Sequence, residues 1–151
     1  MLPVQQGIGA KRGMEMIAHV ASACYSQGFA ILKLDASNGF QEIKRAQLHD
    51  AMRRRCPSLL NLFKRYYTKV ATCFFELNGD VRMIQATEGA RIGCKMSSFG
   101  FALTVHDMYE ALRVYLNGLG DGSCVKAATD DVVIMIKTTP GEDKQFYQLQ
   151  D

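Results

Sequence analysis

Three aspartates interrupt parts of the chain that are otherwise apolar, and they are the side chains best suited to chemistry. Asp130 and Asp131 are adjacent and separate two short apolar segments, residues 124–128 and 132–136. Asp35 directly follows another apolar run, residues 29–34. An uncompensated carboxylate is costly to bury, so acids at the ends of core strands need a counter-charge. The alternative is that each acid occupies a solvated turn, where Asp is common, or caps a helix.

If the strands that carry these acids are neighbours in one sheet, the three carboxylates converge. Their mutual repulsion would then be relieved by hard cations that prefer oxygen ligands, such as Mg²⁺ or Mn²⁺. Two such ions, about 3.5–4 Å apart, stabilise the attacking and leaving oxygens of a phosphoryl or nucleotidyl transfer. The acids therefore indicate a two-metal site with Asp35, Asp130 and Asp131 as ligands.

The elements that would position these acids follow from apolar spacing and from turn residues. Helical spacing predicts helices over residues 14–26, 41–54, 58–67 and 96–116. Short apolar runs predict strands over 29–34, 70–77, 81–87, 124–128 and 132–136, and the first of these is expected to be buried. Asn78-Gly79 between two strand-like runs is a strong hairpin signal. This order predicts an α+β fold with a mostly antiparallel sheet packed on helices.

Length and composition limit the classes of protein. The 151 residues are 48% hydrophobic and 22% charged, which is typical of one folded domain and not of a disordered chain. Five scattered cysteines form no Cys-x-x-Cys pair, so reduced thiols are expected instead of a disulfide framework or a zinc site. The sequence contains no run of about 18 apolar residues, so no membrane-spanning helix is predicted. No signal peptide is recognised, so an intracellular location, cytoplasm or nucleus, is expected.

Positive charge is concentrated in one part of the chain. Residues 41–69 carry eight basic and two acidic side chains, whereas the whole chain has a net charge of only +3. Such a block suggests contact with a polyanion. A solvated helix face would give the same pattern, so charge alone does not decide between the two.

Three segments, in this order along the chain, resemble the palm motifs of reverse transcriptases. Leu-Asp-Ala-Ser-Asn-Gly-Phe at residues 34–40 is similar to the first catalytic motif. Residues 88–103, with Gly89, Arg91 and Gly93, resemble the second motif, and Ala128-Thr129-Asp130-Asp131 resembles the third. Residues 6–15 also look like the stretch before the palm in some non-LTR retrotransposon polymerases. The resemblance extends from residue 3 to residue 136.

The resemblance implies a polymerase palm-like antiparallel sheet packed on helices, with part of the fingers and no thumb. It implies a partial fingers segment over 1–28, a palm over 29–137 and a polar tail over 138–151. Asp35, Asp130 and Asp131 would be catalytic and would hold two Mg²⁺ or Mn²⁺ ions. Phe40 would lie under the nucleotide sugar and clash with a 2′-OH. Further nucleotide contacts would come from Arg91, Gly93 and Lys95, and nucleic-acid contacts from Lys44, Arg45, Arg53, Arg54, Lys64 and Arg65.

The implied function is that of an RNA-directed DNA polymerase, a nucleotidyltransferase that adds a dNTP to a primer 3′-OH on an RNA template. Its partners would be the RNA template, the DNA primer and the dNTP, with no membrane; other segments of a longer polyprotein or a ribonucleoprotein are further candidates. One alternative is a catalytically inactive, domesticated reverse-transcriptase-like protein that binds RNA or acts as a scaffold. Another is an RNA-dependent RNA polymerase palm, which Phe40 and residues 93–96 fit less well. Unrelated two-carboxylate hydrolases would leave the pattern over residues 89–101 unexplained.

Overall fold

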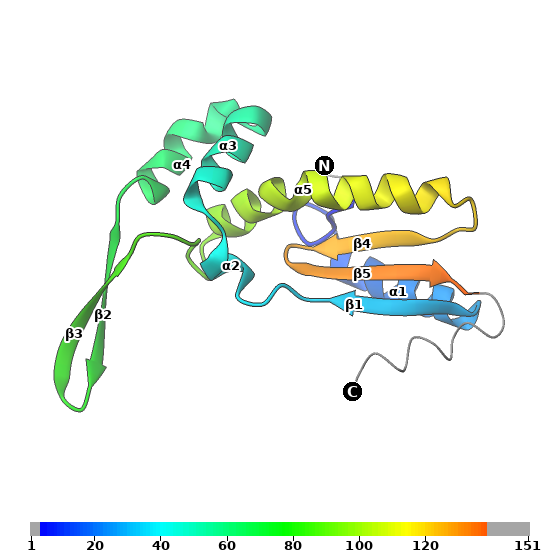
Figure 1. The fold of residues 1–151 in the computed structure, drawn as a ribbon, viewed down its shortest axis with the longest axis horizontal. Coiled ribbons are helices and arrows are strands. Elements are labelled where there is room, and N and C mark those ends of the chain that lie inside the picture. The colour runs from blue at the N-terminus through cyan, green and yellow to red at the C-terminus, as the bar shows by residue number, and fades with distance from the viewer. Residues whose placement is uncertain (1–3, 139–151) are drawn as a thin grey trace. The chain divides into compact units, whose positions relative to one another are not determined.

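The structure is a computed structural model, and it describes residues 4–138. The elements of this part of the chain alternate between helices and strands (Figure 1). They are α1 (Gly13–Ser26), β1 (Phe29–Leu34), α2 (Gly39–Glu42), α3 (Arg45–Arg55), the 3₁₀ turn η1 (Pro57–Leu59), α4 (Leu60–Tyr67), β2 (Ala71–Leu77), β3 (Asp80–Ala86), α5 (Lys95–Gly118), β4 (Cys124–Ala128) and β5 (Asp131–Lys137). The prediction of an α+β fold with antiparallel sheets is confirmed. Among the described residues, no helix is long and apolar enough to cross a membrane. Apart from Thr138, the predicted polar tail lies outside the described residues.

These elements form two compact units. The first combines residues 4–36 with residues 105–138, and the second consists of residues 37–104. Helix α5 belongs to both, since its first turns lie in the second unit and the rest lies in the first. The three domain ranges implied by the resemblance divide the chain on a different basis, and they stay a prediction.

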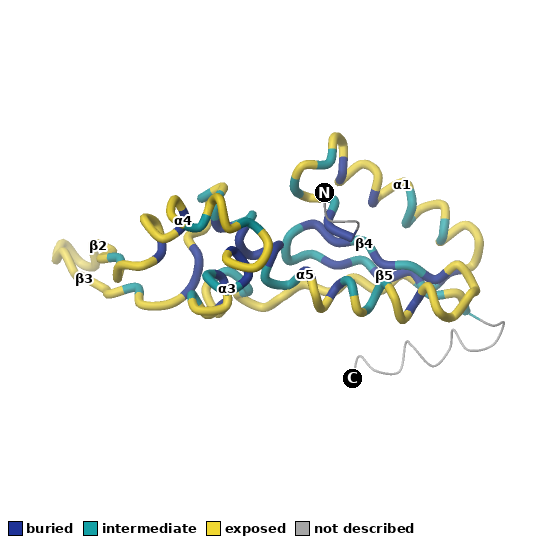
Figure 2. Tube along the Cα trace, turned by 90° about the horizontal axis from the view of Figure 1, so that it is seen from above, coloured by how far each residue is buried: buried dark blue, intermediate teal, exposed yellow. Residues whose placement is uncertain are grey.

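The first unit is a three-stranded antiparallel sheet between two helices. The strand order is β1-β5-β4, so β5 is the central strand. Helix α1 and the later turns of α5 lie on opposite faces of the sheet (Figures 1 and 2). Side chains of β4 and β5 on the α5 face alternate with those on the α1 face, as the pleat requires. The buried cluster on the α5 face consists of Val4, Tyr109, Leu116, Val125, Ala127, Val132 and Ile134.

The N-terminal segment adds to the edge of this sheet beside β4. Gln5 forms a parallel bridge with Ala127. The Gln6 N–H donates to the Ala127 carbonyl oxygen at 2.7 Å, and the Ala127 N–H donates to the carbonyl oxygen of Val4 at 3.0 Å. The N-terminal segment therefore satisfies the N–H and carbonyl groups of Ala127 at the outer edge of β4, and Val4 and Gln5 are buried there.

Strand β1 is less buried than its apolar sequence predicts. Phe29 is buried, but the side chains of Ile31, Leu32 and Leu34 are 37%, 44% and 45% exposed. The reason is position: within the described residues, β1 pairs only with β5 and forms the other edge of the sheet. An apolar run of this length occurs in central strands and in edge strands alike, so the prediction of a buried strand is wrong.

The second unit packs short helices around the first turns of α5. The single helix predicted over residues 41–54 is wrong, because Ile43 and Lys44 are extended, with ψ of 130° and 128°, and separate α2 from α3. The side chain of Ile43 is buried at this break. The helix predicted over 58–67 begins as the 3₁₀ turn η1 and continues as α4. The core of the unit contains Leu48, Met52, Phe63, Tyr67 and Phe101.

The predicted hairpin is confirmed as β2 and β3. Its two turn residues, Asn78 and Gly79, have φ of 55° and 83°. Positive φ at both central positions is the geometry of a two-residue type I′ turn, which Asn-Gly favours. Most side chains of the two strands are exposed (Figure 2).

Candidate functional site

The three predicted catalytic acids lie at one end of the sheet in the first unit, where β1 ends and β4 turns into β5. The β1–β5 ladder ends at the pair Leu34 and Val132. Asp35 follows Leu34 and Asp131 precedes Val132, so both acids adjoin this last pair. Asp131 also forms the last pair of the β4–β5 ladder, with Ala128, so Thr129 and Asp130 are the two residues of that turn. β1 and β5 are neighbours in one sheet, which is the condition that the two-metal hypothesis sets. We call Asp35, Asp130 and Asp131 the acidic edge.

The turn that carries Asp130 has an unusual backbone. Thr129 has a φ of 63°, in the left-handed region that β-branched residues rarely adopt. The buried side chain of Gln5 stabilises this conformation by two hydrogen bonds to the same residue. Its amide Nε2 donates to the Thr129 carbonyl oxygen at 3.0 Å, and its Oε1 accepts from the Thr129 N–H at 2.9 Å. Gln5 therefore fixes the turn on which Asp130 and Asp131 are mounted.

Gly7 allows the N-terminal segment to pass close to the same turn. A Cβ at this position would lie 2.9 Å from the Cα of Ala128, which is closer than real side chains approach. Sequence reasoning missed Gln5 and Gly7 as supports of the acidic edge. No local signal points to either of them, because Gln5 acts across a separation of 124 residues.

Lys33 is a further residue that the sequence-based prediction missed. Its Nζ lies 3.0 Å from Oδ1 of Asp131. The hydrogen bond to Asp131 and the charge of that carboxylate raise the pKa of Lys33. Desolvation opposes this effect, and the charges of Asp35 and Asp130 make smaller contributions that raise the pKa. The signal available in the sequence was a lone charge inside an apolar run, two residues before Asp35.

A buried tyrosine lies on the other side of the acidic edge. Tyr109 belongs to the core cluster between α5 and the sheet. Burial raises the pKa of its hydroxyl, and the negative charges of Asp130 and Asp131 raise it further. Tyr109 therefore stays protonated and neutral close to the acids, and it contributes no competing negative charge.

The acidic edge fits hard divalent cations in the type of its donors. All three side chains offer carboxylate oxygens, which are the ligands that Mg²⁺ and Mn²⁺ prefer. Asp35 is exposed, while Asp130 and Asp131 are half-buried, so a cation can reach them from solvent. Within residues 4–138, no three His, Cys, Asp or Glu side chains form a group that could hold an ion. In this structure the carboxylate of Asp131 is turned toward the ammonium of Lys33 instead.

The predicted nucleotide-binding residues all belong to the second unit. Phe40 is half-buried, and its ring stacks on that of Phe101 with centroids 4.8 Å apart and an interplanar angle of 22°. Its carbonyl oxygen accepts a hydrogen bond from the Ala90 N–H at 2.6 Å. These contacts link the first motif to the second motif within the unit, and they account for Phe40 as a packed aromatic whatever else it does.

Two glycines of the second motif have positive φ but different surroundings. Gly93 has a φ of 81°, and a Cβ there would meet nothing within 4 Å. Gly89 has a φ of 78°, and a Cβ there would lie 2.6 Å from the carbonyl oxygen of Gln41. The sequence singled out Gly93, whereas the chain's own packing depends on Gly89. Arg91 and Lys95 flank Gly93, and both are exposed.

A buried polar network supports the loop between these glycines and α5. The hydroxyls of Tyr67 and Ser97 are hydrogen-bonded to each other. The Ser97 hydroxyl donates to the Arg91 carbonyl oxygen at 2.6 Å, and the Arg91 N–H lies 3.3 Å from the Tyr67 hydroxyl oxygen that accepts it. Cys94 stands just before α5. Burial acts to raise the pKa of its thiol, but hydrogen bonds from the Ser97 N–H, the Tyr67 hydroxyl and the Met96 N–H outweigh it and lower that pKa.

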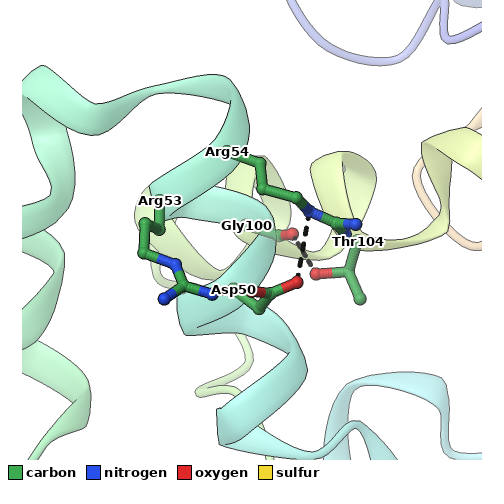
Figure 3. Close-up of polar contacts among 5 residues, drawn as sticks. All are labelled: Asp50, Arg53, Arg54, Gly100 and Thr104. Carbon is green, nitrogen blue, oxygen red and sulfur yellow. Dashed lines mark hydrogen bonds and ion pairs between the residues drawn. The ribbon is translucent and has the colours of Figure 1, made fainter.

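The six predicted nucleic-acid-binding residues have different surroundings. The guanidinium of Arg45 donates to the carbonyl oxygens of Gly89, Lys69 and Glu88, so this side chain ties α3 to the second motif. Arg53 and Arg54 both form ion pairs with Asp50, and the Arg54 pair is 3.1 Å long (Figure 3). The remaining three, Lys44, Lys64 and Arg65, are exposed.

A surface pocket opens between α3 and α4 inside this basic region. Its volume is about 430 Å³, and it is lined by Ala46, His49, Asp50, Arg53, Leu60 and Lys64. The basic side chains of the pocket, Arg53 and Lys64, come from both helices. The second unit therefore presents positive charge around a concave surface, with Asp50 as the opposing charge.

Comparisons with known proteins give no family assignment. No known protein family and no curated protein matches the chain. The fold is that of an α+β protein, and three acids lie at one end of its three-stranded antiparallel sheet.

Proposed function

We propose that the chain is the palm of an RNA-directed DNA polymerase of the non-LTR retrotransposon type. Three sequence segments in the family's order support this proposal, and each contributes residues of a type that the reaction needs. The observation that carries it is the strand register: Asp35 of the first motif and Asp131 of the third both adjoin the last pair of the β1–β5 ladder, although 96 positions separate them in the sequence. An acidic pair in a solvated turn would require no such partner.

In the proposed reaction, the 3′-OH of a primer attacks the α-phosphate of a dNTP and pyrophosphate leaves. Asp35, Asp130 and Asp131 would hold the two divalent ions. When bound, the ions lower the pKa of the attacking hydroxyl and neutralise charge on the leaving group. Positioning and electrostatic stabilisation supply most of the rate in such transfers.

The second unit would bind the nucleotide and the nucleic acid. The ring of Phe40 would exclude a nucleotide with a 2′-OH, because an aromatic ring packed on Phe101 cannot easily move aside. The exposed side chains of Arg91 and Lys95 would attract phosphates. Gly93, where no chain atom would meet a Cβ, would let a nucleotide or template base approach the backbone. Lys44, Lys64 and Arg65 would contact nucleic-acid phosphates.

The test is primer extension on an RNA template with labelled dNTP and Mg²⁺ or Mn²⁺, comparing the wild-type chain with Asp130→Asn. Asp80→Asn is the matched control, since Asp80 also adjoins a two-residue hairpin turn but lies in β3. We expect incorporation that is lost in Asp130→Asn, retained in Asp80→Asn and poorly inhibited by NTP. Full incorporation by Asp130→Asn, or none by the wild-type chain, would contradict the proposal.

A second candidate function is RNA binding without catalysis, in a domesticated scaffold protein. The ion pair between Lys33 and Asp131 favours it, because it gives the acidic edge a counter-charge without any metal ion. The basic residues of α3 and α4 would serve either function. RNA binding that weakens with salt but is unchanged by EDTA and by Asp35→Asn, together with no incorporation, would support this candidate over the polymerase.

A further inference from the structure

Lys33 is the one charged residue of β1, which is otherwise apolar. The strand reads Phe-Ala-Ile-Leu-Lys-Leu, and Asp35 is the next residue of the chain. Lys33 pairs with Val133 in the β1–β5 ladder, so these two side chains lie on one face of the sheet. Asp131 comes two residues before Val133 in β5, so its side chain lies on that face too. The lysine thus reaches Asp131 diagonally across the β1–β5 ladder.

The ion pair uses an oxygen that a metal ion would need. Nζ of Lys33 is 3.0 Å from Oδ1 of Asp131. A divalent cation bound to the same carboxylate would stand about 2.0–2.1 Å from its oxygen, and two positive charges so close together repel each other strongly. An ion bound to this carboxylate therefore competes with the ammonium for it. The ammonium can swing away, because the Lys33 side chain is 65% exposed on a flexible stem.

The charges of the site also show what Lys33 does when no ion is bound. Three carboxylates at the same end of a sheet repel one another, and a single ammonium beside them reduces that repulsion.

We infer that Lys33 is a resident counter-ion of the acidic edge, which stabilises the three carboxylates in the absence of metal and competes with divalent cations for Asp131. This inference rests on the proposed function, because it assumes that the acidic edge binds Mg²⁺ or Mn²⁺. Lys33 is a positioning residue in this role: it controls access of the ions and does not touch the reacting atoms.

The inference predicts opposite effects of one substitution with and without metal. In Lys33→Met the competitor is gone, so Mn²⁺ should bind about two- to fivefold more tightly, which corresponds to the worth of an exposed ion pair. Without metal, the same variant should melt at a lower temperature than the wild-type chain, because the repulsion among the acids is no longer relieved. Saturating Mn²⁺ should remove that difference. Lys33→Arg should behave like the wild-type chain.

The experiment measures Mn²⁺ binding to the full chain by electron paramagnetic resonance of the free ion, with thermal melts in EDTA and in Mn²⁺. Lys126→Met is the matched control. Lys126 lies opposite Val133 on the β4 side, so it occupies the same row and face of the sheet as Lys33. Its loss changes the net charge equally, so any excess effect of Lys33→Met reports the contact with Asp131.

The outcomes separate this inference from the proposed function. Tighter Mn²⁺ binding by Lys33→Met than by Lys126→Met supports the inference. Equal binding by the two variants overturns it, while the proposed function stands if Asp130→Asn still abolishes Mn²⁺ binding and incorporation. Absence of Mn²⁺ binding in the wild-type chain and in Lys33→Met overturns the inference and counts against the proposed function as well.

Discussion

At the scale of single residues, the acidic edge depends on a side chain with no chemistry of its own. Gln5 is buried, and both the nitrogen and the oxygen of its side-chain amide are hydrogen-bonded to the backbone of Thr129. Thr129 is in the left-handed region, where a residue with a branched Cβ is strained by an estimated 1–3 kcal/mol. The strain is retained because it sets the direction of the turn, and Gln5 supplies the hydrogen bonds that offset it.

We expect Gln5→Leu to destabilise the chain by about 2–6 kcal/mol. The substitution leaves the N–H and carbonyl groups of Thr129 without their partners in a part-buried environment, at a cost of about 1–3 kcal/mol for each group. Urea unfolding measures the change. Gln27→Leu is the control, since Gln27 is exposed in the same unit and bonds through its backbone: its N–H donates to the Cys24 carbonyl oxygen and its carbonyl oxygen accepts from Nζ of Lys137. Equal stability of the two variants would show that Gln5 does not support the turn.

At the scale of elements, the second motif is held against α2 by the absence of a side chain. The Gly89 N–H donates to the carbonyl oxygen of Ile43, and the Ala90 N–H donates to that of Phe40. These bonds bring the backbone of Gly89 so close to Gln41 that no Cβ fits between them. The glycine of this motif is therefore explained by packing within the unit, before any ligand is considered.

Gly89→Ala should lower stability more than Gly93→Ala does. Both positions have nearly the same positive φ, so both variants should lose about 1–2 kcal/mol from backbone strain. Only Gly89→Ala also forces a Cβ to within 2.6 Å of the Gln41 carbonyl oxygen, which should add at least as much again. Thermal melting of the two variants under the same conditions isolates that collision. A smaller loss for Gly89→Ala than for Gly93→Ala would mean that α2 moves away freely.

The elements that the sequence predicted well are those specified by local signals. The Asn78-Gly79 turn, the long apolar stripe of α5 and the two strands around Asp130 and Asp131 each depend on neighbouring residues, and all of them are confirmed. The errors concern tertiary context. The apolar run of β1 does not say whether a strand is central or at an edge, and the break at Ile43 follows from burying that side chain between α2 and α3.

The residues of the candidate site also fall into those that the sequence could predict and those that depend on tertiary contacts. The acids stood out because carboxylates are rare next to apolar strands, and their common location followed from pairing those strands. Gln5 and Gly7 could not be found, because their contacts with Thr129 and Ala128 join distant parts of the chain. The nucleic-acid role of Arg45 followed from its charge and from the resemblance, whereas its donors are used by three backbone carbonyl oxygens of its own unit.

At the scale of the whole molecule, charge is segregated between the two units. The acidic edge belongs to the first unit, and the basic helices α3 and α4 belong to the second. With a net charge of only +3, binding of a polyanion cannot depend on the average field of the protein. It has to depend on local clusters, of which Lys64 and Arg65 on α4 form an exposed part.

We therefore expect the double variant Lys64→Ala/Arg65→Ala to bind single-stranded RNA more weakly and with less dependence on salt. Each lost phosphate contact lowers the slope of log K against log salt concentration by about 0.7, so loss of both contacts lowers it by about 1.4. Filter binding or fluorescence anisotropy at several salt concentrations measures the slope. Lys11→Ala/Arg12→Ala is the control, because it removes the same charge from exposed positions in the first unit.

Asp50→Asn tests the same surface in the opposite direction. Asp50 forms ion pairs with Arg53 and Arg54 and lines the pocket between α3 and α4, so its carboxylate both repels phosphate and occupies two cations (Figure 3). Its neutralisation should strengthen RNA binding and steepen the salt dependence, while the α4 double variant does the reverse. If the control double variant weakens binding as much as the α4 variant, and Asp50→Asn changes nothing, the basic helices are a solvated surface and RNA binds elsewhere.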